Sequence, residues 1–193
     1  MLTLLFAACT GDEPAATNGA ARQPPSRFDA VHAAPQKQVA TDDFCEVKSD
    51  AATAKTFVLP PLDGAPMASS DGWTWVNVWA TWCGPCIAEM PMLVKWQERL
   101  SKDGLSYGLS FLSVDAKADE LAKWQATNKT SPPTMHLAKM DDLSGWLTTI
   151  GLDASAVLPI HLFVDPDQKI RCVRMGGIGE AEYDVVKKVL SGG

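Results

Sequence analysis

The chain has 193 residues, of which 46% are hydrophobic, so it can form one domain with a core of ordinary size and a tail. Its formal net charge of −6 argues against nucleic acid as a partner, because binding to phosphates needs a basic surface. Five cysteines are present, and their positions carry most of the functional signal in the sequence.

The first nine residues form a short apolar run that ends in two alanines and a cysteine. This run resembles the end of a bacterial lipoprotein signal peptide, with residues 1–8 removed and Cys9 carrying lipid. The run is short and has no Lys or Arg ahead of it, which a start codon assigned too late would explain. The alternative is an uncleaved apolar end with an incidental cysteine.

Residues 10–43 are rich in Ala, Pro, Thr, Gln and Asp and have almost no large apolar side chains. A segment of this kind cannot bury enough apolar surface to fold, so we predict a disordered tether over residues 9–43. A folded domain then covers residues 44–193. After a lipidated Cys9, the tether would hold this domain off a membrane.

The remaining sequence alternates strand-like and helical patterns. A short strand at 56–59 precedes two prolines and an Asp-Gly turn. Further strands are predicted over 73–80, 107–115, 134–138, 160–165 and 169–174, and helices over 84–101, 119–127, 141–150 and 180–190. This order indicates an α/β fold with a mixed sheet and helices on both faces, in which residues 160–174 form a hairpin.

A strand meets a helix at the sequence Trp-Cys-Gly-Pro-Cys, residues 82–86. Cysteines three positions apart at a helix start can reach disulfide geometry. Cys83 lies where free N–H groups and the helix dipole stabilise a thiolate, which is the attacking species in disulfide exchange. Cys86, one turn deeper, can attack the mixed disulfide that Cys83 forms.

Half of a zinc site and a purely structural disulfide are the alternatives for this cysteine pair. A structural zinc site needs four ligands, and the chain has neither a second Cys-x-x-Cys nor a spaced pair of histidines. We therefore expect no metal site and no cofactor. His136 and His161 lie on or beside apolar strands and are expected to be packed histidines.

Residues 77–86, Asn-Val-Trp-Ala-Thr-Trp-Cys-Gly-Pro-Cys, are followed by Glu-Met-Pro at 89–91. Together they resemble the TlpA/ResA-like branch of the thioredoxin superfamily, which comprises membrane-tethered, extracytoplasmic thiol-disulfide oxidoreductases. The resemblance covers roughly residues 44–191. It implies a thioredoxin-like fold, an N-terminal hairpin around residues 56–64, and a central helix-strand insertion between residues 114 and 159.

The resemblance also assigns a role to Glu89, one helical turn past Cys86. In ResA-like proteins, a glutamate at the matching position is implicated in exchanging protons with the cysteines. Without the resemblance, a solvated helix residue is the simpler interpretation. Asn77 is neutral and cannot do this proton transfer.

Pro159 resembles the cis-proline that faces the Cys-x-x-Cys in this superfamily; a trans proline at a strand start is the alternative. A cis bond would turn the backbone of Leu158 toward an extended substrate segment. Trp82, beside the nucleophile, is expected to line the same docking surface. The Gly176-Gly177 loop either allows close approach of substrate or only forms a turn.

Two cysteines, Cys45 and Cys172, remain. Some TlpA-like proteins link an N-terminal cysteine to the last strand, and in an oxidising compartment a structural disulfide between these two is expected. Two free, buried thiols are the alternative.

The implied function is reduction of disulfides in cell-envelope client proteins, such as apocytochrome c or copper-site proteins. The protein would be a lipid-anchored monomer outside the cytoplasmic membrane, on its periplasmic side and in either membrane. A membrane thiol donor of the CcdA/DsbD type would restore the dithiol. One alternative is a dithiol oxidant, although strong oxidants in the superfamily usually carry other residues between the cysteines. Another is a copper-delivery module using Met90 and Met92, which also fit helix packing. A peroxidase would need a different cysteine environment.

Overall fold

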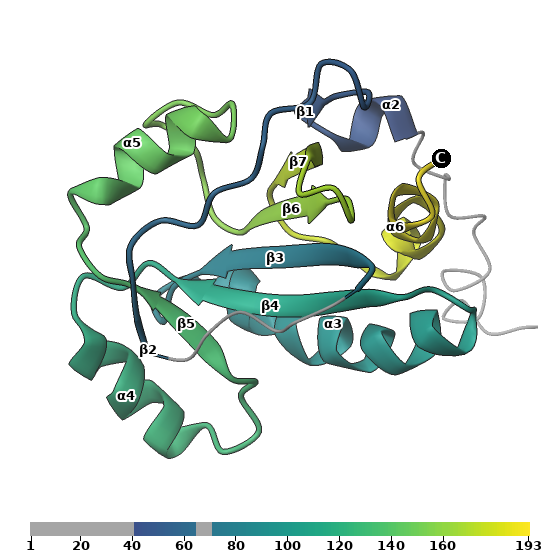
Figure 1. Ribbon diagram of the computed structural model, residues 1–193. Helices are drawn as coiled ribbons and strands as arrows, with labels where there is room; N and C mark the ends of the chain where they lie inside the picture. Colours follow the sequence, from purple (N-terminus) through teal and green to yellow (C-terminus); the bar gives the residue numbers. More distant parts are fainter. Residues whose placement is uncertain (1–40, 65–70) are drawn as a thin grey trace, which may run out of the picture. The chain divides into compact units, whose positions relative to one another are not determined.

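The computed structural model describes residues 41–64 and 71–193, which build one seven-stranded sheet (Figure 1). In chain order the elements are α2 (Thr41–Phe44), β1 (Val47–Lys48), β2 (Leu62–Gly64), β3 (Trp73–Trp79), α3 (Gly84–Lys102), β4 (Tyr107–Ser113), α4 (Ala118–Thr127), β5 (Thr134–Leu137), α5 (Asp142–Thr149), β6 (Ile160–Val164), β7 (Ile170–Met175), the 3-10 turn η1 (Glu180–Glu182) and α6 (Tyr183–Leu190). The strand order is β1-β7-β6-β3-β4-β5-β2. Because β3, β4 and β5 are parallel and the other neighbours antiparallel, the sheet is mixed, as predicted.

The Asp63-Gly64 turn of the expected N-terminal hairpin is not formed, because both residues lie in β2. β1 pairs with β7 at one edge of the sheet, whereas β2 pairs with β5 at the opposite edge. The predicted strand at 56–59 contributes only one bridge, from Thr56 to Lys169, and the predicted turn residues lie inside β2. Pro60 and Pro61 have no N–H to donate to a ladder, so strand pairing is interrupted between residues 56–59 and β2.

Helix α2 begins at Thr41, inside the segment predicted as a tether. Phe44 at its end is fully buried and its ring contacts that of Phe163 on β6. The folded chain therefore starts slightly ahead of residue 44. The rest of the predicted tether, the signal peptide remnant and Cys9 lie outside the described residues. Within the part of the chain that is described, no helix is both long and apolar enough to cross a bilayer.

β3 is the central strand that leads to the cysteine pair. Tryptophan, threonine and valine dominate its sequence, and six of its seven residues are buried because β4 and β6 flank it. Its side chains alternate between the two faces of the sheet. Trp75 and Asn77 lie on the face covered by α3, where Trp75 contacts Trp96. Helix α5 lies across the sheet from α3 and α4 (Figure 1), so both faces carry helices.

Both ends of α3 are fixed by its sequence. Cys83 is the N-cap, and Pro85 occupies the first turn, where a missing N–H costs no hydrogen bond. At the other end, Gly104 adopts a φ of 87° and donates to the carbonyl of Ser101, while Leu105 donates to that of Leu100. These two bonds form a Schellman motif, which requires the left-handed conformation that glycine provides.

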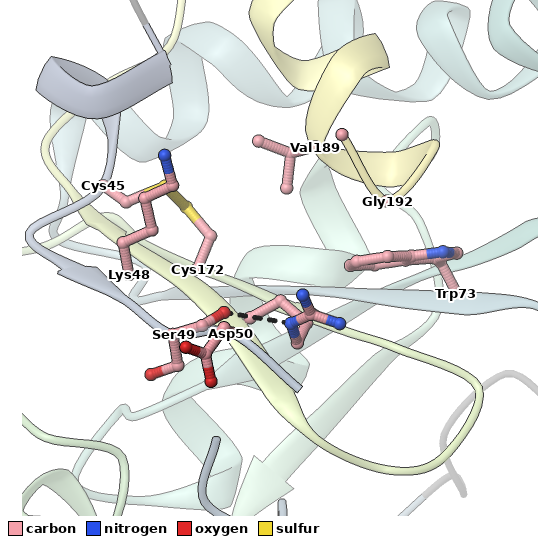
Figure 2. Close-up of a pocket in the computed structure, with 10 residues that line it drawn as sticks. Cys45, Lys48, Ser49, Asp50, Trp73, Cys172, Val189 and Gly192 are labelled. Atoms are coloured by element: carbon pink, nitrogen blue, oxygen red, sulfur yellow. Dashed lines mark hydrogen bonds between the residues drawn. A yellow bond between two sulfur atoms is a disulfide. The ribbon is translucent and has the colours of Figure 1, made fainter. Parts of the chain in front are cut away.

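Cys45 and Cys172 are joined by a disulfide that connects the end of α2 to β7. It lines a pocket of about 170 Å³ together with Trp73 and Gly192 (Figure 2). Trp73 begins β3, whereas Cys83 follows the end of that strand. This bridge therefore lies at the opposite end of β3 from the Cys-x-x-Cys, which is consistent with a structural disulfide.

Removing the Cys45–Cys172 bridge should lower the free energy of unfolding. The two residues are 127 positions apart, and the loop-entropy model gives about 4–5 kcal/mol for a loop of this length. Urea unfolding of Cys45→Ser/Cys172→Ser should show a lower midpoint than the wild type. The matched control is Cys83→Ser/Cys86→Ser, whose bridge closes only three positions. Equal midpoints for the two double variants would contradict this assignment.

The chain has two tyrosines, and both should resist ionisation in the native protein. Burial, and then the hydrogen bond to Asp103, raises the pKa of Tyr183 to about 12, and burial also raises the pKa of Tyr107. Both pKa values exceed that of an unfolded tyrosine, about 10. The two neutral tyrosines therefore contribute fully to stability below about pH 10, and this contribution is lost as the pH rises toward 12. Phenolate absorbance should therefore stay low near pH 10 until the protein unfolds. A native midpoint near 10 would contradict this.

Candidate active site

The structure holds the cysteine pair in its oxidised form at the start of α3. Cys83 and Cys86 are disulfide-bonded, with their Cα atoms 5.3 Å apart. Cys86 is completely buried, whereas Cys83 keeps 5% of its surface exposed. The Cys86 backbone N–H donates to Cys83 Sγ at 3.3 Å. Once the pair is reduced, the same N–H and the dipole of α3 would stabilise a thiolate on Cys83.

The surface beside Cys83 is apolar and open. Trp82, directly before Cys83, is 66% exposed, and Val157, directly before Leu158, is 60% exposed. A side chain on Gly84 would meet no atom within 4 Å, so bare backbone lies next to the disulfide. An extended polypeptide has room to approach the cysteine pair here.

Leu158 and Pro159 lie at the same edge of the sheet as Cys83. β6 runs antiparallel to β3 with Ile160 opposite Val78, so the residues before Ile160 lie beside the exit of β3. The Leu158–Pro159 peptide bond is cis. Pro159 is buried and accepts a hydrogen bond from the Gly176 N–H, while Leu158 is half-buried. The structure thus brings Leu158 and Pro159, two of the three predicted substrate-binding residues, to the cysteine end of the sheet.

Glu89 is buried rather than solvated, with only 4% of its side chain exposed. Its Oε1 accepts from Asn77 Nδ2 at 2.9 Å, and its Oε2 accepts from the backbone N–H of Ile178 at 2.7 Å. It lies on α3 one turn past Cys86, on the buried side of the helix. Both carboxylate oxygens are therefore held by N–H donors inside the protein.

The loop that covers Glu89 depends on Gly176. This residue has a φ of 86°, and a side chain on the next residue, Gly177, would stand 3.6 Å from Glu89 Oε2. The turn at Gly176 is what brings the Ile178 N–H to the carboxylate. The loop therefore contacts Glu89 directly, which its sequence did not indicate.

Two further polar residues at the site were not predicted to have a role. Asn77 and His161 are completely buried and are paired across the β3–β6 ladder, next to Glu89. His161 Nε2 lies 3.3 Å from Glu89 Oε1, a contact distance without the alignment of a hydrogen bond. The sequence offered one signal for Asn77, namely that a polar residue lies between Trp75 and Trp79 on an otherwise apolar strand face.

The arrangement does not favour a metal site. Both sulfurs of the Cys-x-x-Cys are bonded to each other. Among the described residues, no three His, Cys, Asp or Glu side chains are grouped closely enough to hold an ion. Copper delivery through Met90 also lacks support, because Met90 is buried in the core.

Residues 50–173, more than half of the chain, match the model of the AhpC/TSA family. The chain belongs to the AhpC/TSA family. Among solved structures, it is similar to the thioredoxin-related protein from Neisseria meningitidis serogroup B, with 26% identity and a TM-score of 0.51 over 63% of this chain and 86% of that one.

Two further structures share the fold of this AhpC/TSA family member at lower identity. A DsbF homologue from Corynebacterium diphtheriae is 17% identical, with a TM-score of 0.54 over 74% of this chain and 91% of that one. A thiol:disulfide interchange protein DsbE from Chlorobium tepidum is also 17% identical, with a TM-score of 0.50 over 72% and 95% of the two chains. The predicted thioredoxin-like fold is confirmed.

Family, fold and the Cys83–Cys86 disulfide together identify a thioredoxin-like thiol-disulfide oxidoreductase. The geometry brings together the three predicted catalytic residues on α3. These are Cys83 at the helix N-terminus, which is 5% exposed, Cys86, which is completely buried, and the buried carboxylate of Glu89 one turn further along α3.

Proposed function

We propose that this AhpC/TSA family member is a TlpA/ResA-like enzyme that reduces disulfides in client proteins of the cell envelope. The proposal rests on one observation: Cys83 caps α3 and is the only partly exposed member of a pair whose partner, Cys86, is completely buried. This asymmetry separates the sulfur that meets the client from the sulfur that completes the reaction.

The reaction begins when the Cys83 thiolate attacks one sulfur of the client disulfide. A bond forms between Cys83 and that sulfur, and the other client sulfur leaves as a thiolate and takes a proton. Cys86 then gives its proton to Glu89 and attacks Cys83. The Cys83–Cys86 bond forms, the bond from Cys83 to the client breaks, and the second client thiolate is protonated. Client is reduced by two electrons and the enzyme is oxidised by two.

Docking of the client uses the apolar surface formed by Trp82, Val157 and Leu158. Trp82 and Val157 are exposed, and Leu158 lies at the same edge of the sheet. An extended client segment would pair with the Leu158 backbone, as a strand adds to a sheet edge. The two faces of the segment would then contact Trp82 and Val157.

The cellular setting is proposed from the resemblance of the motif and the N-terminus. Cleavage before Cys9 would leave a lipid-anchored, monomeric domain on the periplasmic side of the membrane, with residues 9–43 as a tether. Apocytochrome c and copper-site proteins are the candidate clients, and a membrane thiol donor of the CcdA/DsbD type would return the enzyme to its dithiol form. Metabolic labelling with a fatty acid should mark the wild type and not Cys9→Ser.

The direction of the reaction is tested by the reduction potential of the Cys83–Cys86 pair. A client reductase should have a potential near that of thioredoxin, about −270 mV, rather than near the value of about −120 mV found for a strong oxidant. Equilibration with glutathione or dithiothreitol buffers, followed by alkylation, measures it. In parallel, the protein should accelerate insulin reduction by dithiothreitol. A potential near −120 mV would favour the alternative that the enzyme introduces disulfides.

A further inference from the structure

A buried histidine lies directly behind the proposed acid–base residue. His161 on β6 is completely buried, and its Nε2 is 3.3 Å from Glu89 Oε1. The antiparallel register of β3 and β6 sets it opposite Asn77, whose Nδ2 is hydrogen-bonded to the same Glu89 oxygen. Glu89 therefore contacts two side chains of the sheet, His161 and Asn77. The sequence predicts only packing for His161 and no part in proton transfer for Asn77.

The neighbours of His161 determine which of its nitrogens carries the proton. Trp75 Nε1 lies 3.3 Å from His161 Nδ1, and an indole N–H can only donate. Asn77 Nδ2 also lies 3.3 Å from Nδ1, and its amide orientation is fixed because it must donate to Glu89. Nδ1 is thus an acceptor. In neutral His161 the ring proton must be on Nε2, the nitrogen that faces Glu89.

We propose that His161 is a positioning residue, which holds its Nε2–H toward Glu89 Oε1 so that Glu89 stays a carboxylate able to take the proton of Cys86. This inference rests on the proposed dithiol–disulfide exchange. His161 itself gives and takes no proton. In the resolving step the proton moves from Cys86 Sγ to Glu89, and the Cys86 thiolate then displaces the client sulfur from Cys83.

Packing alone does not account for this arrangement. His161 Nε2 and Asn77 Oδ1 are buried with no hydrogen-bond partner among the described residues. Buried polar atoms without partners destabilise a protein, so an apolar residue would fill the position of His161 better if packing were its only role. The Glu89 Oε1 atom, 3.3 Å away, is the acceptor within reach of His161 Nε2 that the structure describes.

The charged and titratable groups around His161 come from two elements. Helix α3 contributes Glu89, and Cys86 lies one turn away on the same helix. Strand β7 contributes Arg174, which is paired with His161 in the ladder and whose guanidinium is 3.3 Å from Glu46 Oε1. The β3 residues that contact the ring, Trp75 and Asn77, do not titrate in the range of the reaction.

The test separates the two steps of exchange with the aromatic disulfide DTNB. Reduced enzyme should release one thionitrobenzoate when Cys83 attacks, and a second when Cys86 displaces the thionitrobenzoate held on Cys83. In His161→Leu the second phase should slow about 10-fold near neutral pH, the order expected for losing one hydrogen bond to a charged group. Its half-maximal rate should shift upward by about one pH unit, because the Glu89 carboxylate loses an N–H neighbour that stabilises its charged form.

Two comparisons distinguish positioning from packing. His161→Gln can still present an N–H to Glu89 and should recover most of the second-phase rate. His136→Leu removes the other buried histidine of the described chain, on β5, and should leave both phases unchanged. An unshifted pH profile in His161→Leu, or an equal loss in His136→Leu, would overturn the inference.

A measurement on the wild type keeps the inference testable if His161→Leu does not fold. The ¹⁵N chemical shifts of His161 in the reduced protein should report the tautomer protonated at Nε2, and protonation at Nδ1 would overturn the inference. The proposed function can fail separately. If the reduced wild type releases no thionitrobenzoate through Cys83, the exchange reaction itself is refuted. If His161→Leu shows two phases with wild-type rates and an unchanged pH profile, only the role of His161 is refuted.

Discussion

Replacing Cys86 by alanine should turn the enzyme into a covalent trap for its clients. Cys83 can still attack a client disulfide, but no second thiol lies one turn deeper on α3 to displace the bound sulfur. Turnover in the insulin assay should fall by at least about 10³-fold, because an essential nucleophile is missing. Mixed disulfides should accumulate, and non-reducing electrophoresis followed by mass spectrometry would identify the clients.

Two variants control for adventitious disulfides. Cys83→Ala should trap nothing, because Cys86 is completely buried and cannot reach a client. Cys45→Ser/Cys172→Ser should retain exchange at the Cys-x-x-Cys, since its bridge lies at the other end of β3. Equal trapping by Cys83→Ala and Cys86→Ala would show that the assignment of nucleophile and resolving thiol is incorrect.

Replacing Glu89 by glutamine should slow the resolving step by about 10²–10⁴-fold, the usual contribution of a general acid–base residue. The amide has almost the same size but cannot take the proton of Cys86. Because Asn77 Nδ2 and the Ile178 N–H donate to different oxygens of Glu89, the glutamine NH₂ must also face one of these two donors. The second phase of thionitrobenzoate release measures this step, and the first phase should change little.

The matched control for Glu89→Gln is Glu98→Gln on the same helix. Glu98 is exposed and pairs with Lys102, so its loss should leave both phases unchanged. A more demanding check adds Asn77→Asp to Glu89→Gln. The glutamine NH₂ would then donate to Asp at position 77 and its oxygen would accept from Ile178, which restores a buried carboxylate and should recover part of the rate. Wild-type kinetics in Glu89→Gln would exclude proton transfer through this residue.

Most of the fold could be predicted from sequence because its main elements have strong local signals. The apolar, β-branched and aromatic run of β3 and the capped, periodic helix α3 both lie within a few residues of their predicted ends. The edge strands β1 and β2 have only two and three residues, too few to show a period. Their partners, β7 and β5, are distant in sequence, so local patterns could not indicate these pairings.

Within the site, too, local spacing could be predicted from sequence and long-range contacts could not. Cys83, Cys86 and Glu89 are on one helix, and helical spacing alone places them on one side. The contact between Asn77 and His161 joins residues 84 positions apart, and it exists only because β6 pairs antiparallel with β3. Sequence could identify each as buried, but it could not show that both contact Glu89. The Gly176 turn that covers the carboxylate depends on the same tertiary arrangement.

The central claim is that the position of Cys83 at the start of α3 makes it an activated thiol. Its pH-dependent alkylation in the fully reduced protein, resolved from Cys86 by peptide mass spectrometry, tests this most directly. We expect the rate to reach its plateau well below pH 8, because the helix N-terminus stabilises the thiolate, with Cys86 reacting far more slowly. A Cys83 rate that still rises through about pH 8.5, as for an ordinary free thiol, or equal rates for the two cysteines would contradict the account.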